Sequence, residues 1–130
     1  MKIVVVSGGF DPIHSGHIEY FKSAKKNGDR LIVALNSDKW LEKKKGKFFM
    51  PFSERLEIVS SINYVDEVID FDDDSKGSCI NALEKVKKQY PNDEIFFANG
   101  GDRNNSNIPE MSVNGIKFLF SVGGDDKKNS

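Results

Sequence analysis

The fold is decided by the stretch KIVVVSGGFDPIHSGH, residues 2–17. It begins with β-branched residues and no polar alternation, which is typical of a strand buried on both faces of a parallel sheet. Gly8 and Gly9 follow and predict a tight turn. The turn leads into a helix, because the next apolar residues recur at helical spacing until Asn27-Gly28 ends the pattern. The stretch therefore predicts a strand, a turn and a helix in succession.

Strands and helices alternate along the rest of the chain. One helix is expected to begin at Pro51 with Ser53 as its cap, and another contains Ile80 and stops before Pro91. Further strands are expected at residues 30–35, 64–71, 94–98 and 117–122. This alternation predicts an α/β fold, a Rossmann-like open parallel sheet of about five strands with helices on both faces.

The composition limits the classes of protein to consider. Of 130 residues, 38% are hydrophobic and 30% charged, which predicts one globular domain over residues 1–130. The net charge is -1, whereas binders of the nucleic-acid backbone are usually basic. No apolar run suits a membrane span or a signal peptide, and a single cysteine, Cys79, excludes an internal disulfide. We expect a cytoplasmic protein without nucleic-acid or membrane partners.

Two polar stretches are expected to be loops. Residues 43–47 carry four lysines with no apolar period and predict a mobile basic loop, too short to bind nucleic acid. Asp72, Asp73 and Asp74 predict a solvated loop. Because ligands of open parallel sheets bind beyond the carboxyl ends of the strands, we expect the functional residues at such ends. The polar clusters at predicted strand ends are residues 7–17, 36–38, 99–103 and the tail from Gly123.

His14 and His17 are the only two histidines in the chain and stand three residues apart where the first helix begins. At that spacing both imidazoles lie on one side of the helix. The helix N-terminus favours an anion, and Gly16 between them leaves room for a phosphate. Two imidazoles at this place can hydrogen-bond the oxygens on which charge accumulates during phosphoryl transfer.

Two other interpretations stay open. His14 could be a hydrogen-bonded loop residue and His17 a helix cap, without any role in chemistry. Alternatively, the two histidines and Asp11 could bind zinc, although they supply only three ligands. The stretch is neither a Walker loop, since no Gly-Lys-Ser/Thr follows, nor a Gly-x-Gly-x-x-Gly dinucleotide turn. Phosphate binding is the interpretation that we favour, with no metal held by the protein alone.

His14-Ser15-Gly16-His17, after Gly9-Phe10-Asp11, resembles the HxGH signature of the cytidylyltransferase-like nucleotidyltransferases. Later segments resemble further landmarks of this family, in the same order and over nearly the whole chain: Asn36-Ser37-Asp38, residues 51–55, residues 64–68 and Gly100-Gly101-Asp102. The resemblance implies an enzyme that transfers a nucleotidyl group from CTP or ATP to a small phosphorylated acceptor, a sugar or polyol phosphate, and releases pyrophosphate.

The same resemblance implies roles for individual residues. His14 and His17 would hold the triphosphate and stabilise the transition state, and Lys44 would neutralise charge on the phosphates. Lys44 could instead be a solvated surface lysine. Arg103 is a further candidate phosphate ligand, although it could instead be a surface residue. The full set of expected nucleotide-binding residues is Gly9, Phe10, His14, His17, Gly100, Gly101, Asp102, Arg103 and Ser130.

Asp11, Asp38 and Arg55 are the expected acceptor-binding residues. Arg55 could instead pair with Glu54 or Asp66. The triphosphate is expected to arrive with Mg²⁺, which phosphate oxygens and water would hold. The family also implies a homodimer.

The tail departs from the family pattern. Gly123-Gly124-Asp125-Asp126 stands where cytidylyltransferases carry an arginine, and the sequence ends where a serine/threonine pair and a closing helix would follow. Ser130 is taken as the first member of that pair, and the domain is expected to lack its C-terminal helix. The departure leaves one alternative function open, a catalytically inactive nucleotide-binding module of the same fold.

Overall fold

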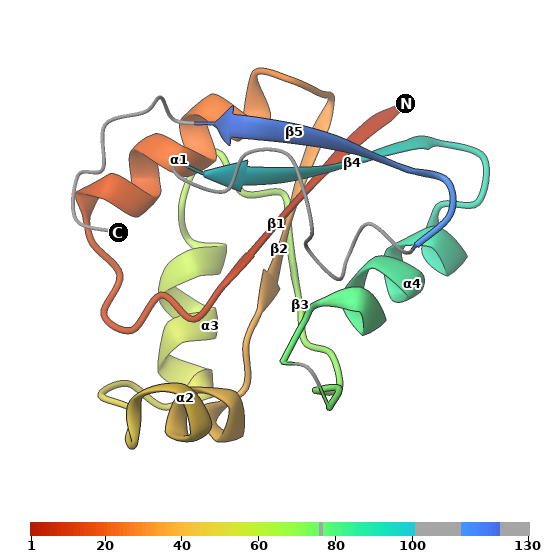
Figure 1. Cartoon of the computed structure of the whole chain (residues 1–130). Helices are drawn as coiled ribbons and strands as arrows, with labels where there is room; N and C mark the ends of the chain where they lie inside the picture. Colours follow the sequence, from red (N-terminus) through yellow and green to blue (C-terminus); the bar gives the residue numbers. More distant parts are fainter. Residues whose placement is uncertain (76, 101–112, 123–130) are drawn as a thin grey trace.

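The computed structural model describes residues 1–75, 77–100 and 113–122, and its five strands form one parallel sheet (Figure 1). The strand order is β3-β2-β1-β4-β5, so β1 lies at the centre. The strands are β1 (Lys2–Gly8), β2 (Arg30–Leu35), β3 (Glu67–Ile69), β4 (Glu94–Gly100) and β5 (Ile116–Val122). Every neighbouring pair is parallel, which confirms the predicted sheet.

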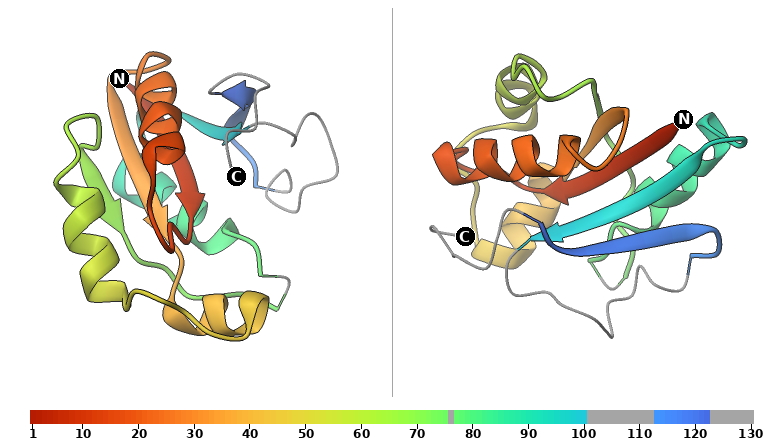
Figure 2. Two further views of the ribbon diagram at one scale, coloured as in Figure 1. Left: turned by 90° about the vertical axis from the view of Figure 1, so that its left-hand side faces the viewer. Right: turned by 90° about the horizontal axis from the view of Figure 1, so that it is seen from above.

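Helices cover both faces of the sheet (Figure 2). They are α1 (Ser15–Lys25), α2 (Asp38–Lys45), α3 (Phe52–Ser60) and α4 (Ile80–Gln89). Successive residues of β1 point to opposite faces, so Ile3 and Val5 pack with α4 while Val4 and Val6 pack with α1 and α3. All four are fully buried, which explains why the strand carries no polar alternation.

The prediction of a mobile basic loop at residues 43–47 is wrong, because Lys43, Lys44 and Lys45 form the last turn of α2. Ser37 caps the start of this helix by accepting a hydrogen bond from the Trp40 amide at 3.0 Å. Gly46 ends it in the left-handed region, with φ of 86°. Lysines in a last turn interact favourably with the helix dipole, so the polar run is compatible with a helix that buries only Leu41.

Two other boundaries differ from expectation. Pro51, and not Ser53, is the N-cap of α3, which begins at Phe52 without a side-chain capping bond. The strand expected at residues 64–71 is confined to β3, because the chain before it turns and the Val65 amide donates to the Ile62 carbonyl. Asp66 then uses its carboxylate to accept from the Leu31 amide at 2.7 Å, beside the first ladder residues of β3.

Gly28 joins α1 to β2 where no side chain fits. A Cβ atom at this position would lie 2.8 Å from the Lys2 carbonyl oxygen and 2.7 Å from Val4 Cγ2. We expect Gly28→Ala to lower the free energy of unfolding by about 1–3 kcal/mol, because backbone would have to move. Urea denaturation measures it, with the exposed substitution Lys88→Ala as the control. Equal stabilities of the two variants would contradict this account.

Candidate functional site

The turn after β1 places its unusual backbone conformation on Phe10, whose φ is 52°. A non-glycine residue in this region is strained and persists only where packing holds it. The ring of Phe10 is buried edge-on against Phe21 and His17, with centroids 5.1 and 4.9 Å away. Gly8 makes this possible, because a Cβ there would lie 2.7 Å from Phe10 Cζ. The glycines thus provide room, while the phenylalanine is the residue that takes the left-handed conformation.

His14 and His17 fix each other at the start of α1. His14 is the N-cap and its Nδ1 accepts from the Gly16 amide, while Nδ1 of His17 accepts from the His14 amide, both at 3.1 Å. The two rings stack with centroids 3.9 Å apart and an interplanar angle of 26°. The side chains therefore point the same way and are half-buried, and the capping role first considered for His17 alone is shared by both residues.

This arrangement determines which nitrogen of each neutral imidazole carries the proton. A ring nitrogen that accepts a hydrogen bond carries no proton, so each neutral ring holds its proton on Nε2 and offers one N–H donor. Burial, and to a smaller extent the neighbouring His14, lower the pKa of His17 to about 4. At neutral pH the His17 ring is therefore an uncharged donor and not an acid.

Asp11 ties the motif to the segment before α3. Its side chain is fully buried and accepts from the amides of Phe49 and Met50, each at 2.7 Å. Lys45 donates to the Asp11 carbonyl at 2.6 Å and lies 3.7 Å from its carboxylate. Protein groups therefore occupy the carboxylate that was expected to face the acceptor.

Arg55 is a fully buried guanidinium that hydrogen-bonds to four residues in three segments of the chain. It donates to the carbonyls of Met50, Gly9 and Asn36 at 2.9, 2.9 and 2.7 Å, and to Asp38 Oδ1 at 2.6 Å. Its ion-pair partner is thus Asp38, and the alternative pairing with Glu54 or Asp66 is wrong. Two of the expected acceptor residues contact each other, and only Asp38, 33% exposed, has accessible surface.

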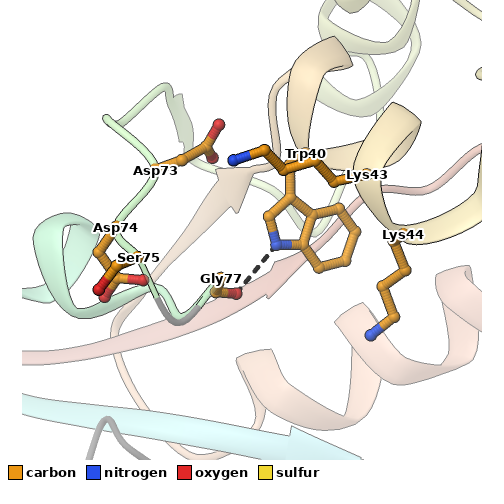
Figure 3. Close-up of a pocket in the computed structure, with 7 residues that line it drawn as sticks. All are labelled: Trp40, Lys43, Lys44, Asp73, Asp74, Ser75 and Gly77. Carbon is orange, nitrogen blue, oxygen red and sulfur yellow. Dashed lines mark hydrogen bonds between the residues drawn. The ribbon is translucent and has the colours of Figure 1, made fainter.

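A cavity of about 280 Å³ lies between α2 and the loop after β3 (Figure 3). Trp40 forms one wall, and its indole N–H donates to the Gly77 carbonyl at 2.9 Å. The other edge of the indole approaches the turn after β1, since a Cβ on Gly9 would lie 3.6 Å from Trp40 Cζ3. The lining residues are Trp40, Lys43, Lys44, Asp73, Asp74, Ser75 and Gly77. The same side chain therefore borders both the turn after β1 and the cavity.

The structure places Lys44 on the wall of this cavity, with Nζ 5.0 Å from the centre of the Trp40 ring. Lys45, one residue later, is the lysine that contacts the motif. Trp40 and Asp73 were missed as candidate residues. Trp40 is the only tryptophan of the chain and follows Asp38 closely, a signal that could have been used. The aspartates at 72–74 were expected to be solvated, but Asp73 and Asp74 are half-buried.

Other expected nucleotide contacts can be placed only in part. Gly100 is the last residue of β4, at the same edge of the sheet as the motif. Tyr20 of α1 donates to the Ala98 carbonyl at 2.6 Å, which ties the helix of the two histidines to the end of that strand. Gly101, Asp102, Arg103 and Ser130 lie outside the described residues.

The sequence matches the family model described as cytidylyltransferase-like over residues 5–114. The chain belongs to the cytidylyltransferase-like family. Bifunctional protein HldE of Blochmanniella floridana is 40% identical over 109 residues, which are 82% of this chain and 21% of that protein. The HldE protein of Erwinia tasmaniensis is 35% identical over 136 residues, 95% of this chain and 28% of that protein. The chain thus spans only about a quarter of the length of these relatives.

Solved structures of similar fold agree with membership of the cytidylyltransferase-like family. A lipopolysaccharide core biosynthesis protein from Thermoplasma volcanium aligns with a TM-score of 0.69 and 26% identity, over 92% of this chain and 95% of that one. A putative nicotinate-nucleotide adenylyltransferase from Vibrio parahaemolyticus aligns with a TM-score of 0.61 over 92% of this chain and 76% of that one. At 16% identity the second match shows the fold alone.

Among the described residues, no helix has the length and apolar character to cross a membrane.

The capping geometry predicts the proton positions of this cytidylyltransferase-like domain. In nitrogen NMR spectra at pH 7, His17 should show the Nε2–H tautomer, because its Nδ1 accepts the His14 amide hydrogen bond. Below the ordinary histidine pKa of 6.5, His17 is protonated in the unfolded chain but remains neutral in the folded protein until about pH 4. The contribution of His17 to the free energy of unfolding therefore falls as the pH is lowered from about 6.5 to 4. A titration of His17 centred near 6.5 in the folded protein would contradict the geometry.

Arg55→Lys should destabilise the domain although it keeps the charge. One ammonium cannot replace four hydrogen bonds that diverge from a planar guanidinium, so buried carbonyls lose their donors. We expect a loss of about 3 kcal/mol in the free energy of unfolding, measured in urea. Arg30→Lys is the matched control, because the half-buried Arg30–Glu67 pair should change by under about 1 kcal/mol. A loss at Arg55 no larger than at Arg30 would refute this role.

Proposed function

We propose that this domain transfers a nucleotidyl group from CTP or ATP to a small phosphorylated acceptor, a sugar or polyol phosphate, and releases pyrophosphate. The observation that carries the proposal is the stacked pair of His14 and His17. Their Nδ1 atoms are used by backbone amides, so two parallel rings each keep one Nε2–H donor for an anion. The N-terminus of α1 adds positive potential at the same place.

The chemistry needs no covalent intermediate on the protein. An oxygen of the acceptor phosphate attacks the α-phosphorus in line, the bond from that phosphorus to the bridging oxygen breaks, and pyrophosphate leaves with the electron pair. The acceptor phosphate is already ionised at neutral pH, so no strong base is required. His14 and His17 stabilise charge on the phosphate oxygens as hydrogen-bond donors held in a fixed geometry.

Mg²⁺ enters in this proposal as part of the triphosphate substrate. In the part of the chain that the structure describes, no group of three or more His, Cys, Asp or Glu residues could hold a metal ion. The ion would be bound mainly by phosphate oxygens and water, as Mg²⁺ commonly is with nucleotides.

We place the acceptor in the cavity beside Trp40. It adjoins Gly9 through the indole, and Lys43 and Lys44 supply positive charge for a phosphate. Asp11 and Arg55 are saturated by protein contacts, so we assign them to positioning the phosphate turn and the segment before α3. The similarity to a lipopolysaccharide core biosynthesis protein from Thermoplasma volcanium supports a sugar phosphate as the acceptor.

A panel that pairs CTP and ATP with sugar, polyol and aminoalkyl phosphates, read by pyrophosphate release, tests the proposal. His14→Asn and His17→Ala should each reduce turnover about 10²-fold or more, because one charge-stabilising donor is lost. Asn is itself a good N-cap, so His14→Asn separates catalysis from helix capping. The exposed residue between them gives the control Ser15→Ala, which should retain turnover. Tight nucleotide binding without release for any pair would favour the inactive binding module instead.

A further inference from the structure

The cavity beside Trp40 has walls of opposite charge (Figure 3). Lys43 and Lys44 come from α2, whereas Asp73, Asp74 and Ser75 come from the loop after β3. A site for a bare phosphate would not place carboxylates opposite its lysines, because they repel the anion. The lining instead suits a molecule with a phosphate at one end and hydrogen-bond donors at the other.

Of the two carboxylates, Asp73 is the one with an unused oxygen. Asp74 accepts from the Ser78 amide at 2.8 Å and also from the Ser78 hydroxyl. Asp73 Oδ2 accepts from the Ser37 hydroxyl at 2.8 Å. Its Oδ1 is shielded from solvent and has no hydrogen-bond partner among the described residues. A carboxylate oxygen without a donor in such a place is costly, so a donor brought by a ligand would stabilise it as the wall adjusts.

The position of Asp73 is fixed from the opposite wall. Ser37, which donates to Asp73, is also the N-cap that accepts from the Trp40 amide. The Ser37 hydroxyl therefore positions both the Asp73 carboxylate and the backbone of Trp40. A molecule that packs on the Trp40 ring consequently lies at a fixed position relative to Asp73. Figure 3 shows Lys43 extending toward Asp73, so a second cation at that end would be repelled, whereas a neutral hydroxyl would not.

We propose that Asp73 determines the acceptor specificity of this domain: its carboxylate accepts a hydrogen bond from a hydroxyl of a sugar or polyol phosphate whose phosphate lies against Lys44. The carbon face of the acceptor packs on the Trp40 indole. The inference rests on the proposed function in treating the cavity as the acceptor site.

Trp40 provides a readout that is independent of turnover. It is the only tryptophan of the chain and lines the cavity, so intrinsic fluorescence reports occupancy directly. The full chain is titrated with a hexose 1-phosphate, glycerol 3-phosphate, ethanolamine phosphate and inorganic phosphate. We expect at least one of the two hydroxylated phosphates to bind about tenfold or more tightly than inorganic phosphate or ethanolamine phosphate, the size expected for a hydrogen bond to a charged acceptor.

Asp73→Asn is the decisive variant, because asparagine can keep the bond from Ser37 while losing the charge. The preference for hydroxylated phosphates should fall to about threefold or less, while inorganic phosphate binds as well as before or better. Asp72→Asn removes the same charge from the neighbouring exposed residue and should leave the preference unchanged. A merely structural role of Asp73 would weaken all four compounds alike.

The inference is overturned if the wild-type protein shows no preference, prefers ethanolamine phosphate, gives no fluorescence response, or keeps its preference in Asp73→Asn. Pyrophosphate release together with any of these results leaves nucleotidyl transfer standing and removes only the role of Asp73. Selective fluorescence binding with no pyrophosphate release from any pair has the opposite meaning: the cavity binds hydroxylated phosphates, but the proposed transfer fails.

Discussion

Two backbone amides at the start of α1 control the chemistry that the site can perform. The amides of His14 and Gly16 are among the donors that every helix leaves without a partner inside the helix, and each is taken up by a histidine Nδ1. Local folding therefore uses one nitrogen of each ring and leaves the other nitrogen for a ligand. Capping and phosphate binding, which look like competing interpretations in the sequence, are compatible because an imidazole has two nitrogens.

The turn that leads to these rings is fixed by packing and by hydrogen bonds to other segments. Phe10 is kept in a left-handed conformation by its packing against Phe21 and His17, and Asp11 fastens the next residue to the segment before α3. Arg55 adds a bond to the Gly9 carbonyl and another to Asp38. Asp11 and Arg55 thus form their hydrogen bonds within the protein and make the turn rigid. Electrostatic stabilisation of a transition state requires rigidity of this kind.

The fold could be predicted because its signals are local. The unbroken β-branched run of β1, the helical spacing that ends at Gly28 and the strand at 30–35 each depend on neighbouring residues alone. What could not be predicted depends on contacts between distant segments. The partner of Arg55 is 17 residues away, the amides that occupy Asp11 are 38 and 39 residues away, and the bond from Ser37 to Asp73 spans 36 residues. No periodicity in the sequence encodes these pairings.

The helix α2 shows how such a contact changes the meaning of a polar run. Its lysines have no apolar period, yet Ser37 at one end and Gly46 at the other enclose a helix whose buried residue, Leu41, lies where Gly9 has no side chain. Once formed, the helix places Trp40 between the turn after β1 and the loop after β3. An acceptor seated against that indole would approach the triphosphate from a fixed side. A Cβ on Gly9 would lie 2.6 Å from Leu41 Cδ2, so the missing side chain at Gly9 matters less for backbone freedom than for letting Leu41, and with it α2, pack directly on the turn that leads to the histidines.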